Sequence, residues 1–128
     1  MAFTQLLLIF LGGGLGATTR FILSTFVNTK TANPDTVNFP WGILSCNLIG
    51  CLLIGATYGW LKSHHPEWIH PLFVTGLFGG FTTFSSFALD TQILIQNQAY
   101  LTAAIYSIGT LILGLLLCAT GFFITSQL

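Results

Sequence analysis

Long apolar stretches alternate with short polar segments along this chain. The apolar stretches occupy, in approximate bounds, residues 3–27, 41–61, 71–95 and 100–124. Each reaches the roughly 20 helical residues that are needed to cross the hydrocarbon core of a bilayer. The pattern therefore predicts an all-α membrane protein with four transmembrane helices in a single domain, residues 1–128.

The third apolar stretch carries residues that weaken its helix. It combines adjacent glycines with hydroxyl side chains: Gly79, Gly80, Thr82, Thr83, Ser85 and Ser86. Non-helical backbone inside a bilayer persists only where it is buried in protein or lines a polar cavity. We therefore expect a mid-membrane break near residues 79–83, with exposed carbonyls able to hold a cation and freed N–H groups or hydroxyls able to meet an anion.

Phenylalanines recur at every third position of the same stretch, at Phe78, Phe81, Phe84 and Phe87. Neighbours in such a series lie near one helical face, and aromatic stripes usually pack in a core. The hydroxyls between the rings favour a second interpretation, because the edge of an aromatic ring carries partial positive charge and attracts a small anion. Packing and anion contact both remain open for these rings.

Polar residues also interrupt the other apolar stretches. Asn47 either bonds to another helix or lines a cavity. Arg20 either serves a functional site or extends its charge to the membrane surface. Asp90 either pairs with Arg20 or faces water, and Tyr106 and Thr110 lie one turn apart on a common face of the fourth helix.

Charge is scarce, since 53% of residues are hydrophobic and 5% are charged, against about 25% charged in a soluble domain. Lys30 and Lys62 fall on opposite sides of the expected membrane, so basic residues give little preference for one orientation. A chain of this kind can insert both ways up, which allows an antiparallel dimer. Four helices also enclose little space, so we expect a polar pathway to require an oligomer.

Several classes of function lack the residues that they need. The chain offers no nucleophile–base pair, no phosphate-binding loop and no carboxylate buried in mid-membrane, so neither an enzyme nor a proton-coupled transporter is expected. Cys46, Cys51 and Cys118 lie within apolar stretches, where a thiol packs as a small hydrophobe. The loop residues His64, His65, Glu67 and His70 lack a recognisable zinc spacing.

Two alternatives to an anion channel remain. Small multidrug/proton antiporters are also four-helix chains that pair antiparallel, but they exchange protons through a buried carboxylate that the first helix here lacks. A non-transporting membrane scaffold would account for the glycines and aromatic rings. It would not account for hydroxyls interleaved in a broken helix.

Four segments resemble the Fluc (CrcB) family of fluoride ion channels. They are Gly12–Phe21 with its arginine, Asn47–Gly50, Gly79–Phe87 and Tyr106–Gly114. The resemblance covers essentially the whole chain, and the third-helix segment is its most specific part. Two departures are Ser86, where threonine is common in the family, and Gly114, where some members have serine.

The resemblance implies a passive, fluoride-selective channel in the bacterial plasma (inner) membrane that lowers cytoplasmic fluoride toxicity. It implies a dual-topology antiparallel homodimer with two pores and a buried sodium ion. Carried over by position, the fluoride pathway would include Phe84, Phe87, Asn47, Ser85, Ser86, Tyr106 and Thr110, with Arg20 near a vestibule. The backbone carbonyls of Gly79 and Thr82 would hold the sodium ion.

Overall fold

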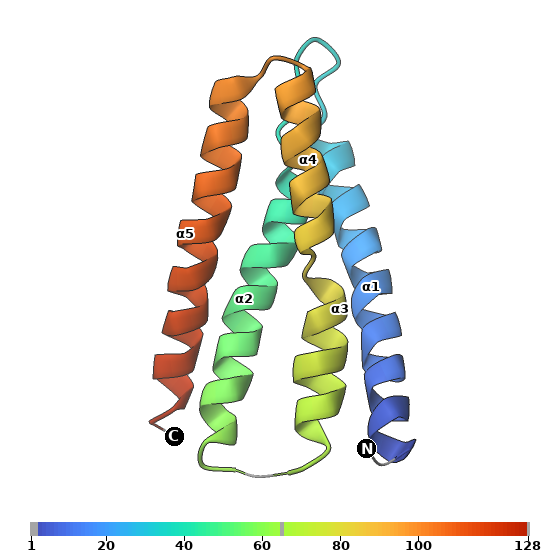
Figure 1. Cartoon of the computed structure of the whole chain (residues 1–128), viewed down its shortest axis with the longest axis vertical. Coiled ribbons are helices and arrows are strands. Elements are labelled where there is room, and N and C mark those ends of the chain that lie inside the picture. The colour runs from blue at the N-terminus through green and yellow to red at the C-terminus, as the bar shows by residue number, and fades with distance from the viewer. Residues whose placement is uncertain (1–2, 65, 128) are drawn as a thin grey trace.

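The computed structural model describes residues 3–64 and 66–127, and these residues form a bundle of long helices (Figure 1). Four helical spans are long and apolar enough to cross a membrane. The expected all-α class is thus confirmed, with four helices that are able to span a membrane. In chain order the elements are α1 (Phe3–Thr31), α2 (Trp41–Leu61), η1 (His70–Phe78), α3 (Gly79–Phe81), α4 (Phe84–Gln96) and α5 (Tyr100–Thr125).

Several helix ends differ from the expected bounds. α1 continues to Thr31, beyond the expected end near residue 27, and the hydroxyls of Thr29 and Thr31 donate to carbonyls one turn earlier in the same helix. These polar residues lengthen the helix past its apolar part, which is why hydropathy alone did not indicate them. The third span begins at His70 and ends at Gln96, one residue beyond the expected range at each end.

The third span opens as a π-helix, which the sequence did not indicate. η1 runs over nine residues from His70 to Phe78, with Pro71 in its first turn. π-Helical turns are rare in proteins as a whole, and those that occur often lie near functional sites. The three-residue α3 follows directly, so this part of the span is helical up to Phe81.

Glycines bring the helices into backbone contact. A Cβ atom on Gly12 would lie 2.2 Å from the Leu72 carbonyl oxygen, and one on Gly16 would lie 2.1 Å from that of Leu77. α5 approaches α2 in the same way, because a Cβ on Gly55 would lie 2.1 Å from the Cys118 carbonyl oxygen. Small residues allow this close approach between membrane helices.

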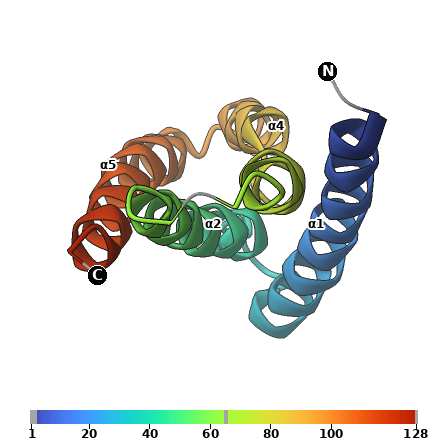
Figure 2. The same ribbon diagram turned by 90° about the horizontal axis from the view of Figure 1, so that it is seen from below.

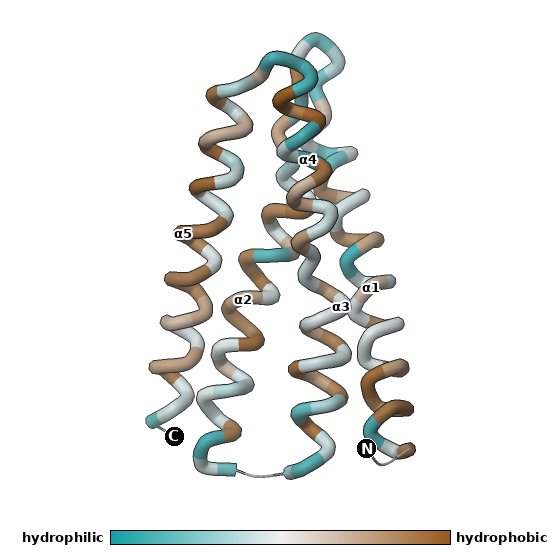
Figure 3. The backbone as a smooth tube through the Cα atoms, viewed as in Figure 1, coloured by the Kyte–Doolittle hydropathy of each residue, from teal (hydrophilic) through white to brown (hydrophobic). Residues whose placement is uncertain are grey.

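The bundle places α1 and α5 on opposite sides, with α2 and the third span between them (Figure 2). Hydrophobic residues predominate along its helices (Figure 3). Many large hydrophobic side chains are exposed, as contact with lipid requires. The small core at the loop end of the bundle contains Leu44, Leu94, Ala103 and Tyr106. Both ends of the chain lie at the opposite end of the bundle (Figure 1).

Candidate functional site

The third span is interrupted at Thr82 and Thr83. Thr82 (φ −82°, ψ 154°) and Thr83 (φ −152°, ψ 117°) are extended, and α4 begins at Phe84. Gly79 and Gly80 remain helical, although the sequence suggested that they would take part in the break. A Cβ on Gly80 would lie 2.5 Å from the Gly13 carbonyl oxygen, so this glycine allows close packing on α1.

Asn47 holds the interrupted backbone in place. Its Nδ2 donates to the Thr83 carbonyl oxygen at 3.3 Å, and its Oδ1 accepts from the Thr83 N–H at 2.8 Å. Both residues are buried, with 8% and 9% of their surface exposed. A buried backbone N–H or C=O needs such a partner. The amide therefore replaces the helical hydrogen bonds that Thr83 loses at the break.

Thr83 also starts the second half of the span. Its Oγ1 accepts from the Ser86 N–H at 3.2 Å, as an N-cap side chain does, and lies 3.1 Å from Ser85 Oγ. The Thr83 hydroxyl donates to Ser86 Oγ at 3.2 Å. Three hydroxyls thus gather around one point of the break. A threonine three residues before Ser86 is an N-cap signal, but the sequence did not separate Thr83 from its neighbours as the capping residue.

The break also frees backbone carbonyls. In a continuous helix the Gly79 and Thr82 oxygens would accept from the N–H groups of Thr83 and Ser86. Those two N–H groups instead donate to Asn47 and Thr83 side chains. The two carbonyls proposed for sodium are therefore released from their usual helical donors.

Arg20 reaches the same region from α1. Its Nη1 donates to the Thr82 carbonyl oxygen at 3.4 Å. Carbonyl oxygens that have lost their helical donors are suitable ligands for Na⁺, and the oxygen of Gly79, a helical residue, has lost its usual donor, the Thr83 N–H. Thr82 fits only if its oxygen serves both the cation and the guanidinium, or if Arg20 turns away. Arg20 does not meet Asp90 as a partner here.

Asp90 accepts a hydrogen bond from the Tyr106 hydroxyl at 3.3 Å. The Tyr106 side chain is fully buried against α4. Thr110, one turn later, donates its hydroxyl to the Tyr106 carbonyl oxygen at 2.6 Å. In this arrangement the Thr110 hydrogen is used within α5, so Thr110 offers an anion no donor unless its side chain rotates.

The four phenylalanines of the third span separate into two pairs. Phe78 and Phe81, before the break, are buried with 8% and 7% of their surface exposed. Phe84 is 80% exposed, and Phe87 packs against the small core. The break turns α4 relative to η1, so the rings do not share one face. Packing accounts for the first pair and not for Phe84.

An aromatic series connects the break to the loop end of the bundle. Ring centroids are 5.5 Å apart for Phe84 and Phe87, 5.3 Å for Phe87 and Tyr106, and 5.6 Å for Tyr106 and Phe39. Phe39 meets Tyr106 edge to face, at 90°. Phe39 was not singled out from the sequence, because it precedes the second span and shares no motif with the others. We call these four rings the aromatic series.

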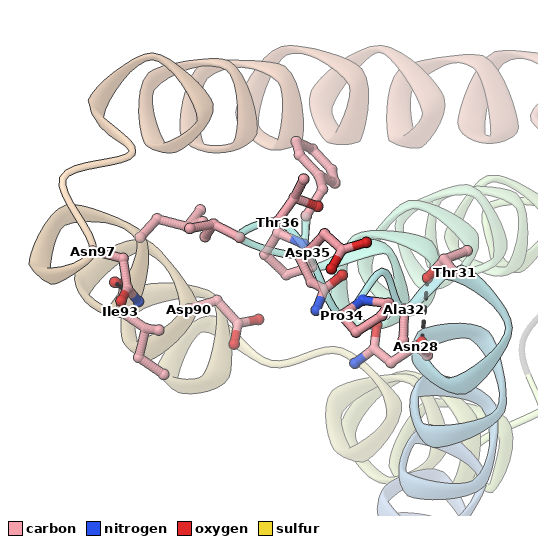
Figure 4. A pocket seen from close by; sticks show the side chains of 14 residues that line it. Asn28, Thr31, Ala32, Pro34, Asp35, Thr36, Asp90, Ile93 and Asn97 are labelled. Carbon is pink, nitrogen blue, oxygen red and sulfur yellow. Dashed lines mark hydrogen bonds between the residues drawn. The ribbon is translucent and has the colours of Figure 1, made fainter.

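A polar pocket of about 690 Å³ lies beside Phe39, between the end of α1, the loop of residues 32–40 and α4 (Figure 4). Its lining includes Asn28, Asp35, Asn38 and Asp90. None of these residues except Asp90 was considered for a site from the sequence. Loop residues carry no helical period, so their convergence appears only once the chain is folded.

The histidine-containing loop does not provide a metal centre among the residues that can be placed. Within residues 3–64 and 66–127, no three His, Cys, Asp or Glu side chains are arranged to hold a metal ion. His65 lies outside the described residues. His64 stacks on Trp60, with ring centroids 4.3 Å apart.

Comparison with known proteins identifies similar chains. A family model described as CrcB-like protein, Camphor Resistance (CrcB), matches residues 7–122. Relatives named fluoride-specific ion channel FluC include one from Phocaeicola vulgatus, 40% identical over 113 residues (88% of this chain and 90% of the relative). Another, from Helicobacter acinonychis, is 43% identical over 119 residues (91% of each chain). A third, from Bacteroides fragilis, is 36% identical over 124 residues (96% and 97%).

Proposed function

This chain belongs to the CrcB-like family, and from that premise we propose that its broken third span carries fluoride across the membrane. The protein is a fluoride-specific ion channel, in keeping with its relatives' names. It lets fluoride leave the cell passively and so lowers fluoride toxicity in the cytoplasm. The antiporter and scaffold alternatives are not favoured. An ion channel is not an enzyme, and we assign no catalytic role to any residue.

The observation that carries the proposed pathway is the exposed ring of Phe84 directly after the break. Fluoride is small and strongly hydrated, so a pore must replace its water while binding it weakly enough for release. Ring edges and hydroxyls are neutral groups that meet this need. Phe84 and Phe87 supply the edges, and Ser85 and Ser86 supply hydroxyls beside them.

We place the break near the middle of the bilayer. The nine-residue η1 and the three-residue α3 precede it, and the 13-residue α4 follows it. Asn47 contributes its remaining amide N–H to the pathway while it holds Thr83. Tyr106 and Thr110 would continue the polar track along α5 once their hydroxyls turn from the Asp90 carboxylate and the Tyr106 carbonyl oxygen, and Arg20 stands at the vestibule side of the break.

The channel is proposed to be an antiparallel, dual-topology homodimer. In one chain Phe84 is exposed at 80%, and a second copy related by a twofold axis in the membrane plane would cover it. Lys30 and Lys62 lie at opposite ends of the bundle, so either orientation is tolerated. Each pore would then run between the subunits.

Sodium is proposed to bind where the two breaks meet. The released carbonyls of Gly79 and Thr82 from both copies would hold it. Bound there, the ion would neutralise carbonyl dipoles and fix the two third spans against each other. Since the relatives are bacterial, we propose the inner membrane as the location of this multi-pass protein.

Flux from liposomes tests the proposed function. Purified protein is reconstituted with trapped potassium fluoride or potassium chloride, and efflux is read with ion-selective electrodes after valinomycin is added. We expect rapid fluoride efflux and little chloride efflux, without a pH gradient. No flux of either ion would support a scaffold, and flux that requires a pH gradient would support an antiporter.

A further inference from the structure

The polar pocket lies at the end of the bundle that carries the loop of residues 32–40. Figure 4 shows Asn28 at the end of α1, Asp35 on the loop and Asp90 on α4 around the same space. Phe39, the first ring of the aromatic series, also lines it. The pocket therefore lies at the beginning of the route that leads to Phe84.

Two of the three amide side chains in the lining are held through their oxygen, whereas the third, Asn97, donates its Nδ2 to the Ile93 carbonyl oxygen at 2.9 Å. Asn28 Oδ1 accepts from the Gly42 N–H at 2.8 Å, and Asn38 Oδ1 accepts from the Asn33 N–H at 2.7 Å. An amide group has its oxygen on one side and its two N–H donors on the other. Among the described residues, the hydrogen bonds of these two side chains use the oxygen alone. Each therefore keeps its NH₂ group available to a ligand in the pocket.

We propose that this pocket is a weak binding site for a small, hard anion, in which Asn28 and Asn38 replace part of the water shell of fluoride. The inference rests on the proposed function, since it takes fluoride as the ion. Amide N–H groups are neutral donors, and hydrogen bonds to an ion are stronger than those to a neutral group. Partial dehydration here prepares the ion for the ring edges further along.

Asp35 keeps the site weak. Its carboxylate lines the pocket, while its backbone N–H donates to Asn33 Oδ1 at 3.0 Å. For an ion about 10 Å from a carboxylate in water, the Coulomb energy changes the local anion concentration about two-fold. Conduction needs binding that is weak enough for release. The second carboxylate in the lining, that of Asp90, accepts a hydrogen bond from the Tyr106 hydroxyl. The Lys30 ammonium group lies over the Phe26 ring, 5.8 Å from its centroid.

Isosteric substitutions test the site. Asn28→Asp and Asn38→Asp keep the oxygen that the Gly42 or Asn33 N–H needs, but remove the N–H donors. Asn33→Asp is the matched control, because it adds the same charge to the same loop and its oxygen also accepts a backbone N–H, yet Asn33 does not line the pocket. Fluoride flux is measured in liposomes at low ionic strength and at about 1 M salt, where the Debye length falls to about 3 Å.

At low ionic strength we expect Asn38→Asp and Asn28→Asp to lower fluoride flux about ten-fold. A loss of about three-fold should remain at high salt, because salt screens the added charge but does not restore the donors. Asn33→Asp should stay within about two-fold at low ionic strength and match the wild type at high salt. Asp35→Asn should raise flux about two-fold at low ionic strength and have no effect at high salt.

The outcomes separate this inference from the proposed function. Equal flux in Asn38→Asp and Asn33→Asp would overturn the amide site while leaving the channel in place. Unchanged flux in Asp35→Asn at low ionic strength would also overturn it, and this variant removes no described hydrogen bond. Absence of fluoride flux from the wild-type protein would overturn both.

Discussion

At the scale of single residues, the break divides side chains of the same type between different roles. Phe78 and Phe81 pack inside the bundle, whereas Phe84 presents its ring outward just past Thr83. The reversal follows from two extended residues, which turn α4 away from the face that η1 and α3 bury. An exposed ring beside hydroxyls is a poor contributor to the stability of one chain and a suitable contact for an anion.

We expect Phe84→Ile to lower fluoride flux at least ten-fold, because isoleucine has no electropositive ring edge. The free energy of unfolding of a single chain should change by less than about 0.5 kcal/mol, since the ring is exposed in one chain. Liposome flux measures the first effect, and thermal unfolding in detergent measures the second. Phe21→Ile is the matched control, because Phe21 is also exposed, at 70%, on α1.

Phe87→Ile should lower flux as well, and it should also loosen the contact with Tyr106. Wild-type flux in both Phe84→Ile and Phe87→Ile would remove the ring edges from the mechanism. Wild-type flux in the Phe21 control is required, since a loss there would indicate a general effect of removing an exposed ring.

Asn47 is the residue on which the geometry of the break depends. We expect Asn47→Ala to leave the Thr83 N–H and carbonyl without protein partners, at a cost of about 1–3 kcal/mol for each group. Thermal unfolding in detergent should show a lower midpoint, and fluoride flux should fall with it. Gln92→Ala, at an exposed position of α4 whose side chain makes no described hydrogen bond, should leave both unchanged. A midpoint for Asn47→Ala equal to that of wild type would mean that the break does not need the amide.

At the scale of elements, the third span changes character three times along its length. It begins as the π-helix η1, continues as α3, opens at Thr82 and Thr83, and resumes as α4. α1 packs along η1 and α3 with backbone in contact with backbone. Gly12 and Gly16 of α1 and Gly80 of α3 allow this approach. Close packing on one side fixes η1 and α3, so the loss of helix is confined to the two threonines beyond that contact.

The glycine contact gives a second test of the fold. Gly16→Ala should separate α1 from η1, because the new Cβ would meet the Leu77 carbonyl oxygen at 2.1 Å. We expect a loss of about 1–3 kcal/mol, as for other overpacked sites, and reduced flux through a displaced break. Gly14→Ala is the control, since nothing lies within 4 Å of a Cβ at that position. Equal unfolding midpoints for the two variants would contradict the packing described here.

At the scale of the whole molecule, the helices of one chain do not enclose the proposed ion pathway on all sides. α1 and α5 lie on opposite sides of the bundle, and large apolar side chains such as Leu101 and Phe84 remain 75% and 80% exposed. Lipid accounts for the exposure of Leu101. A second copy of the chain accounts better for Phe84, because the ring lies next to hydroxyls and to interrupted backbone, which persist in a bilayer where protein covers them.

An antiparallel dimer requires both orientations of the chain in one membrane. We expect a C-terminal reporter to be found on both sides, because Lys30, in the last turn of α1, and Lys62, directly after α2, lie at opposite ends of the bundle. Lys62→Gln should shift the distribution by removing one of two opposed charges. A reporter found on one side only, in wild type and in Lys62→Gln alike, would contradict dual topology.

The amino-acid sequence by itself determined the number of membrane spans and the weakness of the third. Hydropathy sums over about 20 residues, so small errors at helix ends do not change the result. Glycine and threonine have a low intrinsic helix propensity, which is a property of the residue and not of its surroundings. Family membership likewise rests on sequence alone, through matching segments spread over most of the chain.

Only the tertiary structure decided where the third span opens and which polar groups meet there. The break falls on Thr82 and Thr83 because Gly80 packs on α1 and Asn47, 36 positions away from Thr83, satisfies the freed backbone. Asp90 takes Tyr106 as its partner for the same reason, since a hydrogen bond depends on distance in space. Local patterns in a sequence report the period of one helix, and they carry no information about which helix lies beside it.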